Sequence, residues 1–254
     1  MTRPSDLHIP MDDIVEWLTK ARSPTMPEGE CIEFLQLFNP RTIFIKTLPK
    51  GARILDVGAG DGSLVNLKKW PKPLRNDLRM YAYALEKGKN FDAYDGFEIG
   101  DFEKEAPKFG AIKFDAVFCT HFIEHIANPT IFVEWVSSVL NSGGRFYLEW
   151  PSDLSTKFPS RESLSKLGVN LIISNFFDDS THKSIPERGS IINLMNKNSL
   201  HVEQLGVVRI PYFEEEVLAH FWSNNRDRPA VQLAFWSHYR WAQYIIASGL
   251  SERF

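Results

Sequence analysis

A run of small residues after a short apolar strand constrains the fold of this chain more than any other feature. The strand is predicted over 52–57, and Gly58, Ala59, Gly60, Asp61 and Gly62 follow it. Glycines at such a turn adopt backbone conformations that other residues avoid, and they let a ligand approach the main chain closely. The feature predicts an α/β fold with a ligand site where this strand ends.

Strand and helix patterns alternate beyond the glycine turn. Short apolar runs indicate further strands at 80–85, 97–99, 114–119, 145–150, 200–210 and 241–247. Apolar spacings of three and four indicate helices at 11–20, 30–48 with a break at Pro40, 63–70, 130–140 with a glycine stop at 141–144, 190–198 and 214–222. The alternation predicts a seven-stranded, mostly parallel sheet of βαβ units. A last strand that inserts beside its predecessor would give the sheet an antiparallel edge.

Composition limits the partners of the chain. Its 254 residues suit one domain, and a net charge of −3 gives no basic footprint for nucleic acid or for an anionic membrane. The two cysteines, Cys31 and Cys119, do not suggest a disulfide. No apolar run is long enough for a signal peptide or a membrane span. We therefore expect a cytoplasmic protein with a small-molecule partner, neither nucleic acid nor membrane; a homodimer is left open.

Two kinds of ligand compete for the glycine turn. A dinucleotide fingerprint needs a third glycine at position 63, where this chain has Ser63. Asp56 lies two residues before Gly58, where its carboxylate would repel a pyrophosphate and attract a ligand that carries an ammonium and a sulfonium. The turn therefore disfavours a nicotinamide oxidoreductase.

The same stretch resembles motif I of the class I S-adenosylmethionine-dependent methyltransferases, and the resemblance continues in order. Glu86 stands where that family has an acid that binds both ribose hydroxyls. The run 100–102 stands where the family contacts adenine, 114–125 is similar to its fourth strand and "EH" turn, and 140–148 to its fifth-strand entry. The match spans roughly residues 51–151, although Glu86 and Asp101 are only fifteen positions apart and the usual intervening helix is short or missing.

The resemblance implies a Rossmann-like, doubly wound domain that binds S-adenosylmethionine. Asp101 would accept a hydrogen bond from the adenine amine, and Phe102 would lie against the ring. The implied cofactor contacts are Asp56, Gly58, Ala59, Gly60, Glu86, Asp101, Phe102, Cys119 and Thr120. Within one domain over 1–254, we expect an N-terminal helical cap (1–50), a cofactor-binding half (51–151) and a substrate-side half (152–254) with an aromatic lid over 211–239.

Structural interpretations compete for several of these residues. Asp56 can cap the glycine turn, Glu86 can be a solvated residue beside Lys87, and Asp101 can start a turn. Glu124 and His125 are expected to organise the start of the next helix.

Two histidines are candidates for catalysis. Removal of a proton from a hydroxyl acceptor needs a base, and a positioned histidine is the usual one. His182, in a polar loop after the fifth strand, is the first candidate, and His121, after the fourth strand, is the second. His182 can alternatively fix its own turn. A divalent metal held by Asp178, Asp179 and His182 is disfavoured, since adjacent aspartates seldom converge on one ion.

The sequence favours O-methylation of a small molecule with a histidine base. Small-molecule N-methylation is the nearest enzymatic alternative, with an acidic or aromatic cage in place of the base. A protein that binds the cofactor without turnover is the second alternative.

Overall fold

The computed structural model describes residues 9–223 and 227–250. The chain forms two compact units, each assembled from segments that are far apart in the sequence. Unit 1 contains residues 1–39, 151–182 and 207–243, and unit 2 contains residues 40–150, 183–206 and 244–254. The predicted layout of cap, cofactor-binding half, substrate-side half and lid stays a prediction.

Unit 2 contains the sheet, apart from the residues at three strand ends that belong to unit 1. Its strands are β1 (Arg53–Val57), β2 (Arg79–Ala84), β3 (Gly96–Ile99), β4 (Phe114–Thr120), β5 (Leu140–Pro151), β6 (Leu200–Val207) and β7 (Ala242–Gly249). Its helices are α3 (Pro40–Thr47), α4 (Pro129–Val139) and α6 (Arg188–Lys197), with 3-10 turns η2 (Ser63–Lys68), η3 (Phe91–Ala93) and η4 (Ile123–His125).

The strand order is β3-β2-β1-β4-β5-β7-β6. The pairs from β3 to β5 are parallel, with Asp56 opposite Ala82 on one side and Phe118 on the other. The Leu250 N–H donates to the Ser199 carbonyl, which brings the end of β7 beside the start of β6. The two strands therefore run antiparallel, and the predicted mostly parallel, seven-stranded sheet with an antiparallel edge is confirmed.

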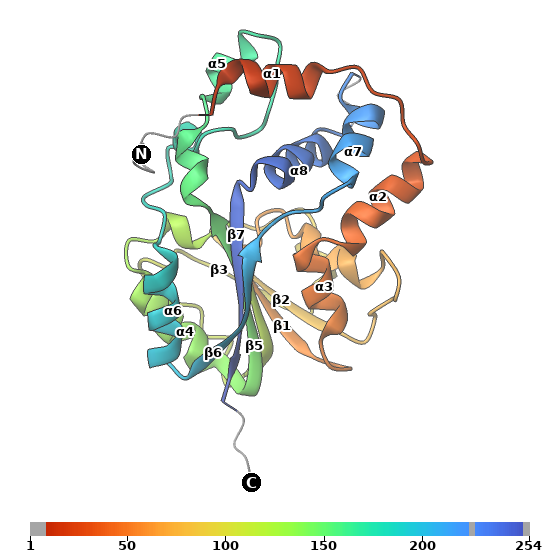
Figure 1. Cartoon of the computed structure of the whole chain (residues 1–254). Coiled ribbons are helices and arrows are strands. Elements are labelled where there is room, and N and C mark those ends of the chain that lie inside the picture. Colours follow the sequence, from red (N-terminus) through yellow and green to blue (C-terminus); the bar gives the residue numbers. More distant parts are fainter. Residues whose placement is uncertain (1–8, 224–226, 251–254) are drawn as a thin grey trace. The chain divides into compact units, whose positions relative to one another are not determined.

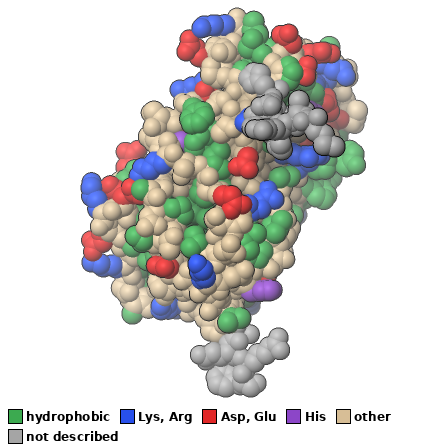
Figure 2. Space-filling model, turned by 60° about the vertical axis from the view of Figure 1, so that its left-hand side comes forward, with side chains coloured by type: hydrophobic (Ala, Val, Ile, Leu, Met, Phe, Trp, Pro, Cys, Tyr) green, Lys and Arg blue, Asp and Glu red, His purple; other side chains and the backbone are tan. Residues whose placement is uncertain are grey.

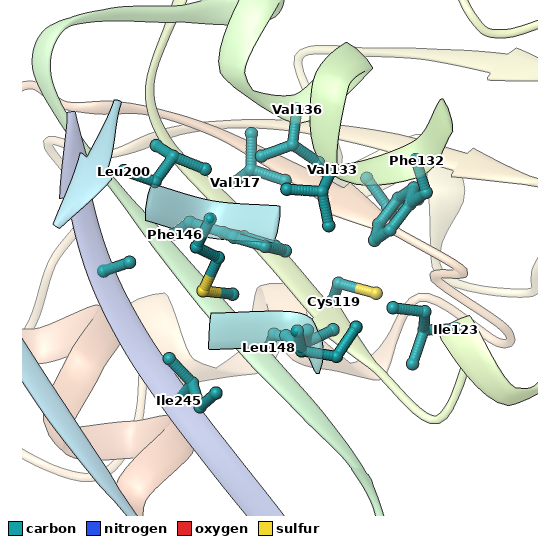
Figure 3. Packing of buried hydrophobic residues seen from close by; sticks show 14 of the residues in the cluster. Val117, Cys119, Ile123, Phe132, Val133, Val136, Phe146, Leu148, Leu200 and Ile245 are labelled. Atoms are coloured by element: carbon teal, nitrogen blue, oxygen red, sulfur yellow. The ribbon is translucent and has the colours of Figure 1, made fainter. Parts of the chain in front are cut away.

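Alternate side chains of the central strands face two apolar layers. On one face Val117 and Cys119 of β4 and Phe146 of β5 pack beneath α4, as Figure 3 shows. Helix α6 lies beside α4 on that face (Figure 1). On the other face, Phe44 of α3 packs against Phe118 and Tyr147. Burial on both faces explains the apolar runs of the parallel strands.

Two local expectations were wrong. The segment after the glycine turn forms the 3-10 turn η2 in place of an α-helix over 63–70, and Pro71 and Pro73 keep it from continuing as a helix. The expected glycine stop at 141–144 is part of β5, which begins at Leu140 directly after α4. The register shifts between Phe114 and Ala116, so the glycines form a bulge in place of a loop.

Unit 1 is helical. Its elements are α1 (Met11–Thr19), α2 (Glu28–Leu37), η5 (Asp153–Lys157), α5 (Arg161–Ser165), η6 (Phe176–Asp178), α7 (Phe213–Phe221) and α8 (Arg228–Tyr239). Helix α2 packs on α7, and α7 on α8. Helix α8, which the sequence interpretation did not predict, begins with the Asp227 carboxylate accepting from the Ala230 N–H and with Pro229 in its first turn.

No helix among the described residues is long and apolar enough to cross a bilayer. On the face that Figure 2 shows, Lys and Arg side chains are interspersed with Asp and Glu side chains and with scattered hydrophobic ones.

Candidate cofactor site

The glycine turn follows β1 and takes left-handed backbone conformations. The φ angles are +73° at Gly58, +53° at Gly60 and +77° at Gly62, a region that side-chain-bearing residues rarely adopt. A Cβ on Gly58 would lie 2.8 Å from Phe122, whereas one on Gly60 would meet nothing closer than 4.0 Å. The turn is therefore packed against Phe122 at its start and open at Gly60.

The segment after β2 is bound to the same turn. The backbone N–H and the side-chain amide of Asn90 both donate to the Asp61 carbonyl, each at 3.0 Å. A Cβ on Gly88 would collide with the carbonyl oxygen of Gly60, so the two backbones approach as closely as glycine allows. This approach holds the segment that follows β2, in which Glu86 lies two residues before Gly88, against the glycine turn.

Asp56 is a buried acid beneath the turn. Its side chain is 4% exposed, and its Oδ2 accepts a 2.6 Å hydrogen bond from the Tyr94 hydroxyl. Burial raises the pKa of Asp56 to about 7, although the Tyr94 bond and the Arg41 charge both lower it. A buried acid with a raised pKa stores electrostatic energy that a cationic ligand releases.

Glu86 and Asp101 differ in how their carboxylates are used. Glu86 is exposed and, among the described residues, forms no side-chain hydrogen bond or ion pair. Asp101 accepts from the Glu103 N–H at 3.1 Å and pairs with Lys104 at 3.3 Å. Asp101 therefore forms the turn that the structural interpretation predicts, and its adenine contact stays a prediction.

Phe102 and Cys119 belong to the core on the α4 side of the sheet. The Phe102 ring is 8% exposed and lies edge-on to Phe132 and Trp135. Cys119 is fully buried, and burial raises its pKa well above the usual range. The cofactor contacts of both residues stay a prediction. Thr120, at the end of β4, is half-buried opposite Glu149.

His121 follows β4 and lies between two acids. Its Nδ1 is 3.3 Å from Glu124 Oε1, and its Nε2 is 3.1 Å from Glu149 Oε1. Burial alone would lower the pKa of His121, but these two carboxylates raise it above its ordinary value. The structure thus places the second catalytic candidate in a strongly ionic setting at the cofactor end of the sheet.

His182 lies in unit 1, at the end of a loop that is stabilised by contacts among its own residues. Its ring stacks on Phe176 at 4.4 Å, and its Nδ1 lies 2.5 Å from the Phe176 carbonyl oxygen. Both oxygens of Asp178 accept backbone N–H bonds, including one from Ser174 at 2.8 Å. The catalytic role of His182 stays a prediction, as does its alternative role as a turn-fixing residue.

The sequence interpretation missed three polar partners in unit 2. Tyr94, the partner of Asp56, carries no signal that distinguishes it from other aromatic residues. Glu149 does carry one, because an acid within the apolar run 146–150 must find a buried partner. That partner is Arg41 of α3, whose Nε lies 2.9 Å from Glu149 Oε2.

Comparison with known proteins identifies the family. The family model of a methyltransferase domain matches residues 28–205, which is well over half of the chain. This chain belongs to the S-adenosylmethionine-dependent methyltransferases. The match covers the glycine turn, Glu86 and the fourth and fifth strands, so the family and its cofactor, S-adenosylmethionine, agree with the sequence prediction.

A curated relative is more specific. The ubiquinone biosynthesis O-methyltransferase of Xanthomonas axonopodis pv. citri is 33% identical over 132 residues, which is 49% of this chain and 52% of the relative. The chain thus matches about half the length of this relative, and the activity of the relative enters only as a proposal for this methyltransferase.

Solved structures support the fold. A chain from the Haloferax volcanii complex that contains the Trm112 methyltransferase activator aligns with a TM-score of 0.56 at 13% identity, covering 94% of this chain and 98% of that one. The [4+2]-cyclase SpnF aligns with a TM-score of 0.52 at 14% identity, covering 95% and 92%. At these identities the likeness shows the fold alone.

The residues of unit 2 fit S-adenosylmethionine. The turn is open at Gly60, the buried acid Asp56 matches a cationic ligand, and the exposed carboxylate of Glu86 can accept from a vicinal diol. The family's cofactor therefore agrees in charge and hydrogen bonding with the donors and acceptors that the turn presents.

Proposed function

We propose that this methyltransferase transfers a methyl group from S-adenosylmethionine to a hydroxyl of a small molecule. The observation that carries the proposal is the 33% identity to a ubiquinone biosynthesis O-methyltransferase. The small acceptor and a cytoplasmic location are part of the proposal. The possibility of a homodimer is left open.

In this proposal unit 2 holds the cofactor. Glu86 would accept from both ribose hydroxyls, and Asp56 would compensate the ammonium. The backbone of Gly58, Ala59 and Gly60 would contact the ligand directly. When bound, S-adenosylmethionine supplies a methyl group on a cationic sulfur, which is already a good leaving group. The protein therefore contributes mainly by positioning the acceptor and excluding water.

His182 is the proposed base. A carbonyl oxygen can only accept, so the contact with the Phe176 carbonyl requires the hydrogen of a neutral His182 ring to be on Nδ1. In that tautomer Nε2 carries the lone pair and can hold the proton of the acceptor hydroxyl. The stacking of the ring on Phe176 fixes its orientation, which is the property that a general base needs.

Two alternatives remain open. Transfer to an amine needs no strong base and would leave His182 as a turn-fixing residue. Binding without methyl transfer is a real option for the fold, since the aligned SpnF structure is that of a cyclase. Retention of Asp56 and of the glycine turn supports cofactor binding in each case.

A screen with a labelled methyl donor tests the proposal. Purified protein is incubated with hydroxyl-bearing and amine-bearing metabolites, and transfer of the label is measured for the wild type and for Glu86→Ala. Asp92→Ala is the matched control, because Asp92 is an exposed acid of the same segment whose side chain pairs with Lys87 at 2.6 Å. We expect label on hydroxyl acceptors, lost in Glu86→Ala and retained in Asp92→Ala. Label on amines alone would contradict O-methylation.

A further inference from the structure

A histidine between two buried carboxylates lies at the cofactor end of β4. Glu124 and Glu149 are fully buried, whereas the His121 side chain is 22% exposed. Each ring nitrogen faces one carboxylate oxygen, at 3.3 Å and 3.1 Å. An ionised carboxylate only accepts hydrogen bonds, so both ring nitrogens must donate if both acids are ionised. With Glu124 and Glu149 as carboxylates, only the imidazolium form satisfies both contacts.

The charges around the ring favour the same form. Glu149 is held as a carboxylate by the Arg41 guanidinium, which contacts both of its oxygens, and by the Tyr147 hydroxyl at 2.7 Å. Arg41 therefore compensates Glu149. The second carboxylate, Glu124, has its Oε2 buried without a hydrogen-bond partner among the described residues. The His121 ring lies 3.3 Å from the other oxygen of Glu124, and a ring nitrogen of His125 also lies within 4.8 Å of a Glu124 carboxylate oxygen. A positive charge on His121, together with that of Arg41, balances the two carboxylates.

The backbone conformation of His121 also sets the position of Phe122, which packs against the glycine turn. Its backbone N–H continues the ladder to the Glu149 carbonyl at 2.9 Å, and its φ of +50° then reverses the chain. A left-handed conformation costs energy for a residue with a side chain and persists only where its surroundings hold it. The reversal places Phe122 against Gly58, where an added Cβ would come within 2.8 Å. The ion cluster thus holds His121 in the conformation that places Phe122 against the glycine turn.

We propose that His121 is a cationic positioning residue and not a base. Its imidazolium bridges Glu124 and Glu149 and holds the turn that presses Phe122 onto the glycine loop, so that cofactor affinity depends on the charge of this ring. An imidazolium has no lone pair with which to accept a proton, which leaves His182 as the proposed base. The inference rests on the cofactor assignment and is independent of the proposed acceptor.

The sign of the pH dependence follows from the groups that face the ring. These are Glu124 of η4, Glu149 and Tyr147 of β5, and Arg41 of α3, whose charge also reaches Asp56 of β1. Burial opposes the charged ring, but the two carboxylates hold the pKa of His121 above its ordinary value. The ring therefore keeps its proton to a higher pH than an ordinary histidine does, and it loses the proton as the pH rises through that raised value. Cofactor affinity should then fall, because Glu124 loses its compensating charge.

Calorimetry with S-adenosylhomocysteine tests the proposal. Dissociation constants are measured from about pH 6 to about pH 9 for the wild type, for His121→Asn and for the double variant His121→Asn/Glu124→Gln. At neutral pH, His121→Asn should bind about tenfold or more weakly, as the loss of a charge-assisted hydrogen bond predicts. The double variant removes one buried negative charge together with the positive charge. Its dissociation constant should therefore return to within about threefold of the wild-type value.

The ratio of the dissociation constants of His121→Asn and of the wild type reports the effect of the His121 ring alone. The amine of the ligand titrates in the same way with both proteins, so its contribution cancels. For His121→Asn relative to the wild type, this ratio should approach one at high pH. A constant ratio, or a double variant no tighter than the single one, would overturn the charge argument.

A second measurement does not depend on the variants. The His121 ring resonances of the wild-type protein, followed by NMR, should be those of an imidazolium at about pH 7. A neutral ring at that pH would overturn the proposal even if the variants fail to fold. A wild-type protein that does not bind S-adenosylhomocysteine would instead contradict the cofactor assignment, and the NMR titration would still decide the charge of His121.

Discussion

Replacing Asp56 with asparagine should stabilise the protein and weaken cofactor binding. Asp56 is 4% exposed, and burial raises its pKa from 3.8 to about 7. Each pKa unit corresponds to about 1.4 kcal/mol, so the ionised side chain destabilises the folded state by roughly 4 kcal/mol at most. Asparagine keeps an oxygen for the Tyr94 hydroxyl and carries no charge.

The direction of the pH effect follows from linkage. Below pH 3.8 the carboxyl is neutral in both the folded and the unfolded state, so burial carries no charge penalty. As the pH rises toward about 7, the unfolded state ionises first and the folded protein loses stability. Above that pH both states are ionised and the loss is complete. The variant lacks this titration, so its advantage should grow by about 3 kcal/mol between about pH 5 and about pH 8.

Denaturant unfolding at the two pH values measures this advantage, and calorimetry measures binding. Asp92→Asn is the control, because Asp92 is exposed and should give the same small change at both pH values. We expect Asp56→Asn to be more stable at the higher pH and to bind S-adenosylhomocysteine more weakly. A stability difference that does not change with pH would refute the assignment of Asp56 as a strained buried acid.

Three further predictions concern the site. Glu86→Ala should lose up to two charge-assisted hydrogen bonds to the ribose and bind S-adenosylhomocysteine at least about tenfold more weakly by calorimetry; an unchanged dissociation constant would make Glu86 a surface residue. His182→Ala should lower turnover about 10²- to 10⁴-fold at unchanged cofactor affinity; near-normal turnover would exclude the base. Gly58→Ala, at a φ of +73° and against Phe122, should lower the melting temperature and the cofactor affinity together; a melting temperature equal to the wild type would contradict the close packing.

The sequence predicted the sheet well because its signals are local. The central parallel strands β1 and β4 are apolar runs buried on both faces, and the glycine turn after β1 identifies the strand that begins the site. The sequence analysis expected an antiparallel edge if the last strand inserted beside its predecessor, and β7 does lie beside β6.

The errors arose where helix length or a strand boundary depends on neighbouring elements. The run after Gly62 has helical spacing, but it forms only the 3-10 turn η2, which ends before Pro71. The glycines after α4 look like a stop in sequence, yet pairing of Leu140 with Phe114 extends β5 back to the end of the helix. Helix α8 was missed although Asp227 and Pro229 are a recognisable helix start.

The candidate site was only partly foreseeable. The order of the motifs pointed to Asp56, which precedes the last residue of β1, and to Glu86, which follows the end of β2. Their environment could not be predicted, since Tyr94 reaches Asp56 across 38 positions and Arg41 reaches Glu149 across 108. Such long-range pairs leave no local periodicity in the sequence.

Calorimetry of the wild-type protein with S-adenosylhomocysteine and, separately, with NAD tests the central claim most directly. The account predicts binding of S-adenosylhomocysteine and none of NAD, because Asp56 beneath the glycine turn favours a cationic ligand over a pyrophosphate and Ser63 replaces the third glycine of a dinucleotide site. Tight binding of NAD with no binding of S-adenosylhomocysteine would contradict it.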